Sequence, residues 1–188
     1  MGKSMGTGQP RLIVVTGRPG AGKTTLAHAL AKAVRCPAIC RDEIKEGLVN
    51  TTGEVGEPGD ALGREVYETF FETVRYLVSR KISVVAEAAF QHKLWAPKVE
   101  TLRELAEVRV VVCSLDPRLA RARHIERGLE DPQRELFHWD RVVTAAREGV
   151  VLPIGEYEPP KLDVPWLVVD TTDEYRPPFD DIVSFATS

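Results

Sequence analysis

Five short runs of apolar, strand-forming residues recur along the chain, and segments with helical spacing separate most of them. The runs are Leu12–Thr16, Ala38–Cys40, Ile82–Ala86, Val108–Cys113 and Trp166–Val169. Strands that alternate with helices in this way predict an α/β fold, in which helices cover both faces of a parallel sheet. Ligands of such sheets bind beyond the carboxyl ends of the strands, so candidate functional residues are expected there.

Apolar residues recur every three or four positions between the strands, which predicts helices with one buried face. The clearest case runs through Leu62, Val66, Phe70, Val74 and Leu77. The other predicted helices are His28–Val34, a helix with Pro97 in its first turn and Val99, Leu102 and Leu105 facing inward, Pro117–Arg127, and Trp139–Arg147.

Two polar segments interrupt this alternation. Residues 51–60, "TTGEVGEPGD", combine three glycines, a proline and three acids, and we expect a mobile substrate loop there. The second segment, residues 127–136, is similarly polar, and together with the arginine-rich helix before it we expect a lid over 118–136. No linker divides the chain, so we predict one domain over 11–188, preceded by a flexible N-terminus over 1–10.

Composition narrows the class of protein further. The 188 residues carry a net charge of −3, which argues against tight binding of long nucleic acids. No apolar stretch reaches membrane-spanning length, and the first ten residues lack the apolar region of a signal peptide. Cys36 and Cys40 lie four apart, unlike a CxxC metal motif, while Cys40 and Cys113 sit in apolar runs. We therefore expect buried thiols in a cytoplasmic protein, and the oligomeric state stays open.

The stretch Gly17–Thr24, "GRPGAGKT", fits the GxxxxGK[ST] motif in full and lies between a predicted strand and a predicted helix. In such a loop, backbone N–H groups and the positive helix N-terminus hold the phosphates of a nucleotide triphosphate. Lys23 can reach the β- and γ-phosphates, and the Thr24 hydroxyl can bind Mg²⁺. The predicted nucleotide-binding residues are Gly17, Arg18, Pro19, Gly20, Ala21, Gly22, Lys23, Thr24 and Thr25.

Two acids follow predicted strands at this edge of the sheet. Asp42 comes just past the second strand, where it can accept the proton of a hydroxyl that attacks the γ-phosphate. Arg41 and Lys45 flank Asp42 and can contact the acceptor. The alternative is that Asp42 only caps the next helix. Glu87 ends the third apolar run, where it can hold Mg²⁺ or orient the acceptor, or is an ordinary acid at a strand end.

Arg123 and Arg127 lie one turn apart in the predicted lid, where they can neutralise the phosphoryl group in transfer and exclude water. Three further arginines of the segment are less well placed, namely Arg118, Arg121 and Arg134. The alternative is a solvated basic helix face. His124 has no partner within reach in the sequence and is expected at the surface. Residues 170–172, after the last strand, either pass near the nucleotide base or form an ordinary turn.

Over roughly residues 11–175, the order and spacing of these motifs resemble the small P-loop kinases. This group includes polynucleotide 5′-hydroxyl kinases, zeta-toxin-type kinases and chloramphenicol phosphotransferase. "TGRPGAGKTTLA" is similar to the phosphate loop of the group, "CRDEIKEGL" to its base-bearing segment, "VVAEAAF" to the segment with its second acid, and "RARHIERG" to its lid. The chain departs from the group at Lys45, where polynucleotide kinases tend to have arginine, and at Glu87, where aspartate is common.

The resemblance implies a three-layer P-loop fold with five parallel strands and a helical lid, ATP and Mg²⁺ as cofactors, and transfer to a hydroxyl. It also implies Asp42 as the base and Arg123 and Arg127 as lid arginines. The sequence thus predicts an ATP-dependent phosphotransferase that acts on a hydroxyl of a small-molecule acceptor. Two alternatives stay open, a 5′-hydroxyl kinase for short nucleic acids and a nucleotide-binding regulatory module without kinase activity.

Overall fold

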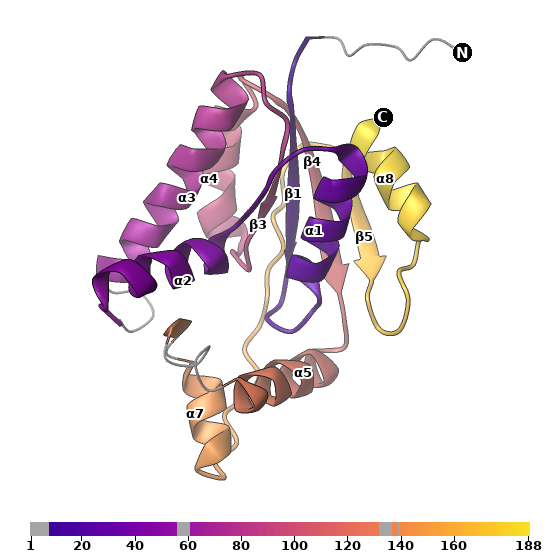
Figure 1. Ribbon diagram of the computed structural model, residues 1–188. Helices are drawn as coiled ribbons and strands as arrows, with labels where there is room; N and C mark the ends of the chain where they lie inside the picture. Colours follow the sequence, from indigo (N-terminus) through magenta and orange to yellow (C-terminus); the bar gives the residue numbers. More distant parts are fainter. Residues whose placement is uncertain (1–7, 56–60, 132–136, 139) are drawn as a thin grey trace.

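Five parallel strands form one sheet in the order β2-β3-β1-β4-β5 (Figure 1). The computed structural model describes residues 8–55, 61–131, 137–138 and 140–188. The strands are β1 (Arg11–Gly17), β2 (Ala38–Cys40), β3 (Val84–Glu87), β4 (Glu107–Ser114) and β5 (Trp166–Asp170). The predicted α/β fold with a five-stranded parallel sheet is therefore confirmed.

Helices cover both faces of the sheet and make the predicted three layers (Figure 1). The helices are α1 (Lys23–Val34), α2 (Arg41–Thr52), α3 (Ala61–Ser79), α4 (His92–Leu102), α5 (Pro117–Glu130), α7 (Arg141–Arg147) and α8 (Phe179–Thr187). Alternate residues of β1 face opposite layers, as a strand requires. Leu12 and Val14 join the buried cluster under α3 and α4, while Ile13 and Val15 join the one under α1 and α8.

Two helices, α5 and α7, lie beyond the carboxyl ends of the strands instead of on a face of the sheet (Figure 1). The Asp116 carboxylate caps α5 by accepting hydrogen bonds from the backbone N–H groups of Arg118 and Leu119. A Cβ atom added to Gly128 of α5 would lie 2.6 Å from a methyl carbon of Val143 in α7. The two helices therefore pack at a distance that only glycine permits, and they form one unit over this end of the sheet.

Thr16, fully buried at the end of β1, holds the start of the glycine-rich loop in place. Its hydroxyl donates to the Ala88 carbonyl at 2.9 Å, accepts from the Trp95 indole at 3.2 Å, and lies 2.7 Å from the Tyr157 hydroxyl. These partners come from the segment after β3, from α4 and from the segment before β5. One buried hydroxyl thus fixes the position of three segments relative to the loop.

Two helical predictions are corrected by the structure. Pro97 was expected in the first turn of its helix, but α4 begins at His92 and contains Pro97 in its interior. The reason is Trp95, which is 1% exposed and packs edge-on against Phe70 and Phe71, so burial extends the helix toward its N-terminus. Leu105 lies in the turn after α4 and is packed against the same cluster.

The structure also differs from the predicted element boundaries near the C-terminus and in the loops. Helix α8 was not predicted, because its nine residues offer only a short apolar pattern around Ile182. Helix α7 begins at Arg141, after the cap Asp140, and Trp139 lies outside the described residues. Of the expected substrate loop, residues 51–52 end α2 and 53–55 are exposed, while 56–60 lie outside the described residues. Residues 132–136 of the expected lid, Arg134 among them, also lie outside them.

The cysteines agree with the prediction made from their sequence context. Cys40 and Cys113 are buried free thiols, as predicted, and Cys36 is a free thiol at intermediate exposure. Within the part of the chain that the structure describes, no helix combines the length and the hydropathy that crossing a membrane requires.

Candidate active site

The glycine-rich loop joins β1 to α1 at the carboxyl edge of the sheet. Gly20 adopts a φ of +82°, and a Cβ atom there would lie 1.9 Å from the carbonyl oxygen of Ala120 in α5. Gly17 is equally restricted, since its Cβ would lie 2.5 Å from the Cys113 carbonyl oxygen. These glycines therefore serve close packing against β4 and α5, in addition to the close approach of phosphates that the motif predicts.

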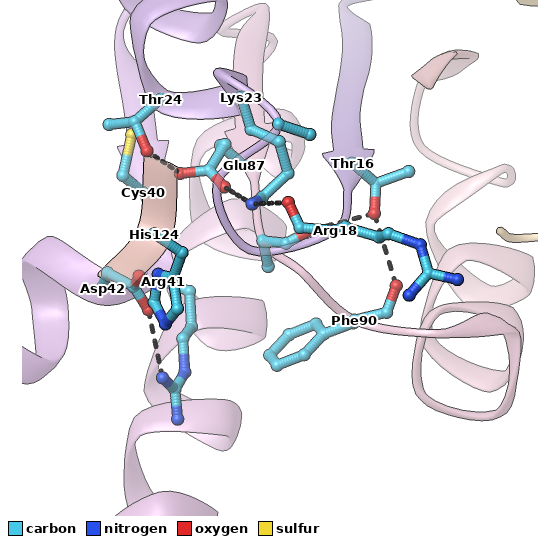
Figure 2. Close-up of polar contacts among 12 residues, drawn as sticks. Thr16, Arg18, Lys23, Thr24, Cys40, Arg41, Asp42, Glu87, Phe90 and His124 are labelled. Carbon is cyan, nitrogen blue, oxygen red and sulfur yellow. Dashed lines mark hydrogen bonds and ion pairs between the residues drawn. The ribbon is translucent and has the colours of Figure 1, made fainter. Parts of the chain in front are cut away.

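Lys23, Thr24 and Glu87 form a polar cluster beside this loop (Figure 2), in which Lys23 and Glu87 are buried and Thr24 is partly buried. The Lys23 ammonium donates to the Arg18 carbonyl at 3.0 Å and lies 3.8 Å from Oε1 of Glu87. The Thr24 hydroxyl donates to Oε2 of Glu87 at 3.0 Å. Lys23 is 8% exposed and Glu87 is 3% exposed, so each charge depends on the other for compensation. Burial raises the pKa of Glu87, while the positive charge of Lys23 opposes that rise.

Asp42 lies in the first turn of α2 and lines the same cavity as Lys23 and Thr24. This cavity has a volume of about 190 Å³, and residues of α5 and α7 form part of its wall. The N-cap of α2 is Cys40, and among the residues that the structure describes no side chain makes a capping hydrogen bond there. The alternative in which Asp42 only caps the helix is therefore wrong, because Asp42 already belongs to the helix and points into the cavity.

The surroundings of Asp42 keep it charged. Burial on its own raises the pKa of Asp42, but the positive charges of His138, Arg41 and Lys23 outweigh this effect and lower the pKa to about 2. The Arg41 guanidinium also donates a hydrogen bond of 3.1 Å to the Asp42 carboxylate (Figure 2). Asp42 is thus a carboxylate at neutral pH, able to accept a hydrogen bond from a hydroxyl in the cavity.

Of the two cations expected beside Asp42, only one lines the cavity. Arg41 does so, whereas Lys45 is 4% exposed and donates to the backbone carbonyl of His138 at 3.2 Å. His138 in turn pairs through Nε2 with Glu46 at 2.7 Å. These two contacts tie α2 to the segment before α7, so Lys45 helps to position the wall that carries His138.

The two lid arginines have different partners although they lie one turn apart. Arg127 lines the cavity that also contains Asp42. Arg123 donates from Nη1 to the Thr171 carbonyl at 3.0 Å and from Nη2 to the Thr172 carbonyl. The Thr171 hydroxyl, itself buried, donates to the carbonyl of Ala21 in the glycine-rich loop at 3.0 Å. Arg123 therefore connects α5 to the segment after β5, and Arg127 is the lid arginine at the cavity.

A histidine–carboxylate pair is the main feature that sequence reasoning missed. His124 pairs through Nε2 with the Asp140 carboxylate and lies 3.5 Å from Nη2 of Arg127. The expectation that His124 lies at the surface without a partner is wrong, since its side chain is 18% exposed and lines the cavity. Burial raises the pKa of Asp140, but the hydrogen bond from His124 and the charge of His124 outweigh it and lower the pKa. The only signal in the sequence was Asp140 itself, as a cap before α7.

A second cavity of about 350 Å³ adjoins the first. Among the described residues, those that line both cavities are Pro19, Ala89, His124 and Asp140. Its outer wall is the segment before β5, which the Arg18 guanidinium holds through a 2.5 Å hydrogen bond to the Gly155 carbonyl and by packing near the Tyr157 ring. The site is therefore two connected spaces, one beside the glycine-rich loop and one beneath the 153–157 segment.

This fold and site define a P-loop protein of the nucleotide-kinase type. Residues 12–147 match the AAA domain family designated AAA_33, and the chain belongs to this family. A search of curated protein sequences gives no match. The predicted resemblance to small P-loop kinases is confirmed at the level of family and fold.

Solved structures agree with this assignment. A protein of Chloroflexus aurantiacus J-10-fl, provisionally named a kinase, superposes with a TM-score of 0.78 at 25% identity, over 95% of this chain and 97% of that one. The Mycobacterium tuberculosis APS kinase CysC, in complex with AMPPNP and APS, gives a TM-score of 0.66 at 16% identity, over 96% and 99%. A gluconokinase from Sinorhizobium meliloti 1021 gives 0.53 at 17%, over 94% and 89%. The last two likenesses concern the fold alone, so they do not identify the acceptor.

Proposed function

We propose that this protein is an ATP-dependent kinase that transfers the γ-phosphate to a hydroxyl group of a small-molecule acceptor. The observation that carries this proposal is that Asp42 lines the same cavity as Lys23 and Thr24 of the phosphate loop. A carboxylate that shares a cavity with the phosphate site is what transfer to a hydroxyl requires, and a protein that only holds nucleotide has no need of it.

The proposed reaction needs one proton transfer and one phosphoryl transfer. The acceptor oxygen forms a new bond to the γ-phosphorus while the bond between that phosphorus and the bridging oxygen breaks, and ADP leaves with the electron pair. The hydroxyl proton passes to the Asp42 carboxylate. A pKa of about 2 makes Asp42 a weak base, which suits a loose transition state in which the hydroxyl needs orientation more than deprotonation.

Positive side chains supply the electrostatic part of the proposal. Lys23 and Arg127 both line the cavity, and we assign Lys23 to the β- and γ-phosphates and Arg127 to the charge that develops on the transferred group. We assign the screening role to Arg127. Arg123 could share it only if the bonds of Arg123 to the carbonyls of Thr171 and Thr172 were broken.

The oxygen ligands for Mg²⁺ in this proposal are the Thr24 hydroxyl and the Glu87 carboxylate. The two groups lie 3.0 Å apart beside the phosphate loop, and oxygen donors of this kind fit Mg²⁺. When bound, the ion supplies neutralisation of the phosphate charge. The chain's own part is to hold both oxygens in place, Glu87 through its burial and Thr24 through the first turn of α1.

The acceptor is proposed to occupy the second cavity and to extend its hydroxyl past Ala89 toward Asp42. The volume of this second cavity, about 350 Å³, suits a compound of sugar or nucleoside size. Its lining mixes apolar side chains such as Ile154 with polar ones such as Gln91. We further propose that residues 11–188 act as one catalytic domain.

The test is a screen for acceptor-dependent ADP release. Sugars, nucleosides, hydroxylated antibiotics and oligonucleotides with a free 5′-hydroxyl are offered together with MgATP. The proposal predicts release with at least one small molecule. Release with oligonucleotides alone would establish the polynucleotide kinase alternative. If no acceptor accelerates ADP release, the protein is a nucleotide-binding module and the proposal fails.

A further inference from the structure

Apart from the cluster of Lys23, Thr24 and Glu87, three side chains of different chemistry meet, one each from α1, β2 and α2. They are His28 of α1, Cys40 at the end of β2, and Glu43 in the first turn of α2. Their ligand atoms all lie within 4.8 Å of one another. We propose that His28, Cys40 and Glu43 form a binding site for Zn²⁺.

The distances fit a tetrahedral ion with little adjustment. Zinc bonds of about 2.3 Å to sulfur and about 2.1 Å to nitrogen, at a tetrahedral angle, place the two ligand atoms roughly 3.6 Å apart. Sγ of Cys40 lies 3.7 Å from Nε2 of His28. Oε1 of Glu43 lies 2.6 Å from the same nitrogen and must withdraw by roughly 0.8 Å to reach the corresponding distance. A half-exposed side chain such as Glu43 can make that change by rotation.

The donor set selects the class of metal. One sulfur, one imidazole nitrogen and one carboxylate oxygen suit Zn²⁺, while Mg²⁺ and Ca²⁺ prefer oxygen ligands only. The proposed site therefore differs in its donor chemistry from the Thr24 and Glu87 oxygens assigned to Mg²⁺. Three protein ligands leave the fourth position of the ion to water.

Access and charge both favour a cation at this position. The side chains of His28 and Glu43 are 51% and 48% exposed, whereas Cys40 is 1% exposed, so an ion can enter from the His28 side and reach the sulfur. The negative charges of the Glu87 and Glu43 carboxylates act on the Cys40 sulfur. The same carboxylate charges attract a divalent cation.

The probe is Co²⁺, which substitutes for Zn²⁺ and gives a charge-transfer absorption only when a thiolate is a ligand. Titration of the full chain should give this absorption at one equivalent, and Zn²⁺ should abolish it. The band should be absent in Cys40→Ser, and Co²⁺ should bind roughly tenfold or more weakly to His28→Ala and Glu43→Gln. Cys36→Ser and Cys113→Ser serve as matched controls and should retain the band.

Three results would overturn the proposal. They are no charge-transfer band, a band that survives Cys40→Ser, and saturation only at millimolar Co²⁺. Because a buried cysteine variant can fail to fold, His28→Ala decides independently. His28 is half exposed, so this variant should stay folded, and unchanged Co²⁺ affinity in it would contradict the site.

Discussion

The Nζ atom of Lys23 lies 3.8 Å from Oε1 of Glu87, and both side chains are almost completely buried. One belongs to the phosphate loop and the other ends the neighbouring strand β3. Because an isolated charge is costly in the interior, this pair stabilises the site as a unit. The relationship therefore allows the folding role and the binding role of Lys23 to be separated by experiment.

Lys23→Met should abolish nucleotide binding and also destabilise the free protein, by up to about 3–5 kcal/mol, because it leaves the Glu87 charge without its partner. The double variant Lys23→Met/Glu87→Gln should recover most of that stability without recovering binding. Chemical unfolding and nucleotide titration measure the two effects. If the double variant were no more stable than Lys23→Met, the two charges would not be coupled.

Gly20→Ala should disrupt the contact between the phosphate loop and α5. The added methyl group would overlap the backbone carbonyl of Ala120, which cannot move without α5. Gly53→Ala is the matched control, because Gly53 has a similar φ of +71° and open space around it. We expect Gly20→Ala to lower the free energy of unfolding by about 1–3 kcal/mol more than Gly53→Ala. Equal losses would mean that only the backbone conformation matters.

Arg127→Ala and Arg123→Ala should have different effects although the two residues share one helix. Arg127 lines the cavity, so its loss should lower turnover by about 10²-fold with little change in nucleotide affinity. Arg123 binds the carbonyls of Thr171 and Thr172, so its loss should mainly lower thermal stability. Steady-state kinetics and thermal unfolding of both variants provide the measurement. A larger loss of turnover in Arg123→Ala would reverse the assignment.

Asp140→Asn isolates the charge of the His124–Asp140 pair, since asparagine can still cap α7 through the Val142 N–H. The lowered pKa of Asp140 means that its charge stabilises the fold above the unfolded pKa of 3.8, and that this stabilisation is lost as pH falls through the folded pKa. His124 faces Asp140 directly, and Arg127 faces it through His124. The variant should be less stable than the wild type at pH 7, with a difference that shrinks toward zero below pH 3.8. If the difference in stability between the variant and the wild type did not depend on pH, the Asp140 charge would not be its cause.

The parts of the site that sequence predicted are those determined by local chain geometry. Gly17–Thr24 is contiguous, so its motif carries its own structure. Asp42 follows β2 and Glu87 ends β3, and parallel strands bring their carboxyl ends to one edge of the sheet. The spacing of these residues along the chain was therefore enough to predict that they lie close together.

The rest depends on tertiary packing that spacing does not encode. His124 and Asp140 are 16 residues apart, and Glu46 and His138 are 92 apart, so no local pattern connects them. Helical spacing placed Arg123 and Arg127 on one face. It could not show that α5 lies between the cavity and the segment after β5, where the two arginines find different partners.

The most direct test of the account is turnover by Asp42→Asn with the acceptor found by the ADP-release screen. Asparagine keeps the size of the side chain and removes its charge, so nucleotide affinity should stay within a few-fold of wild type. Phosphoryl transfer should fall by roughly 10²–10⁴-fold. Transfer at the wild-type rate, with nucleotide still bound, would contradict the role of Asp42 and with it the proposed chemistry.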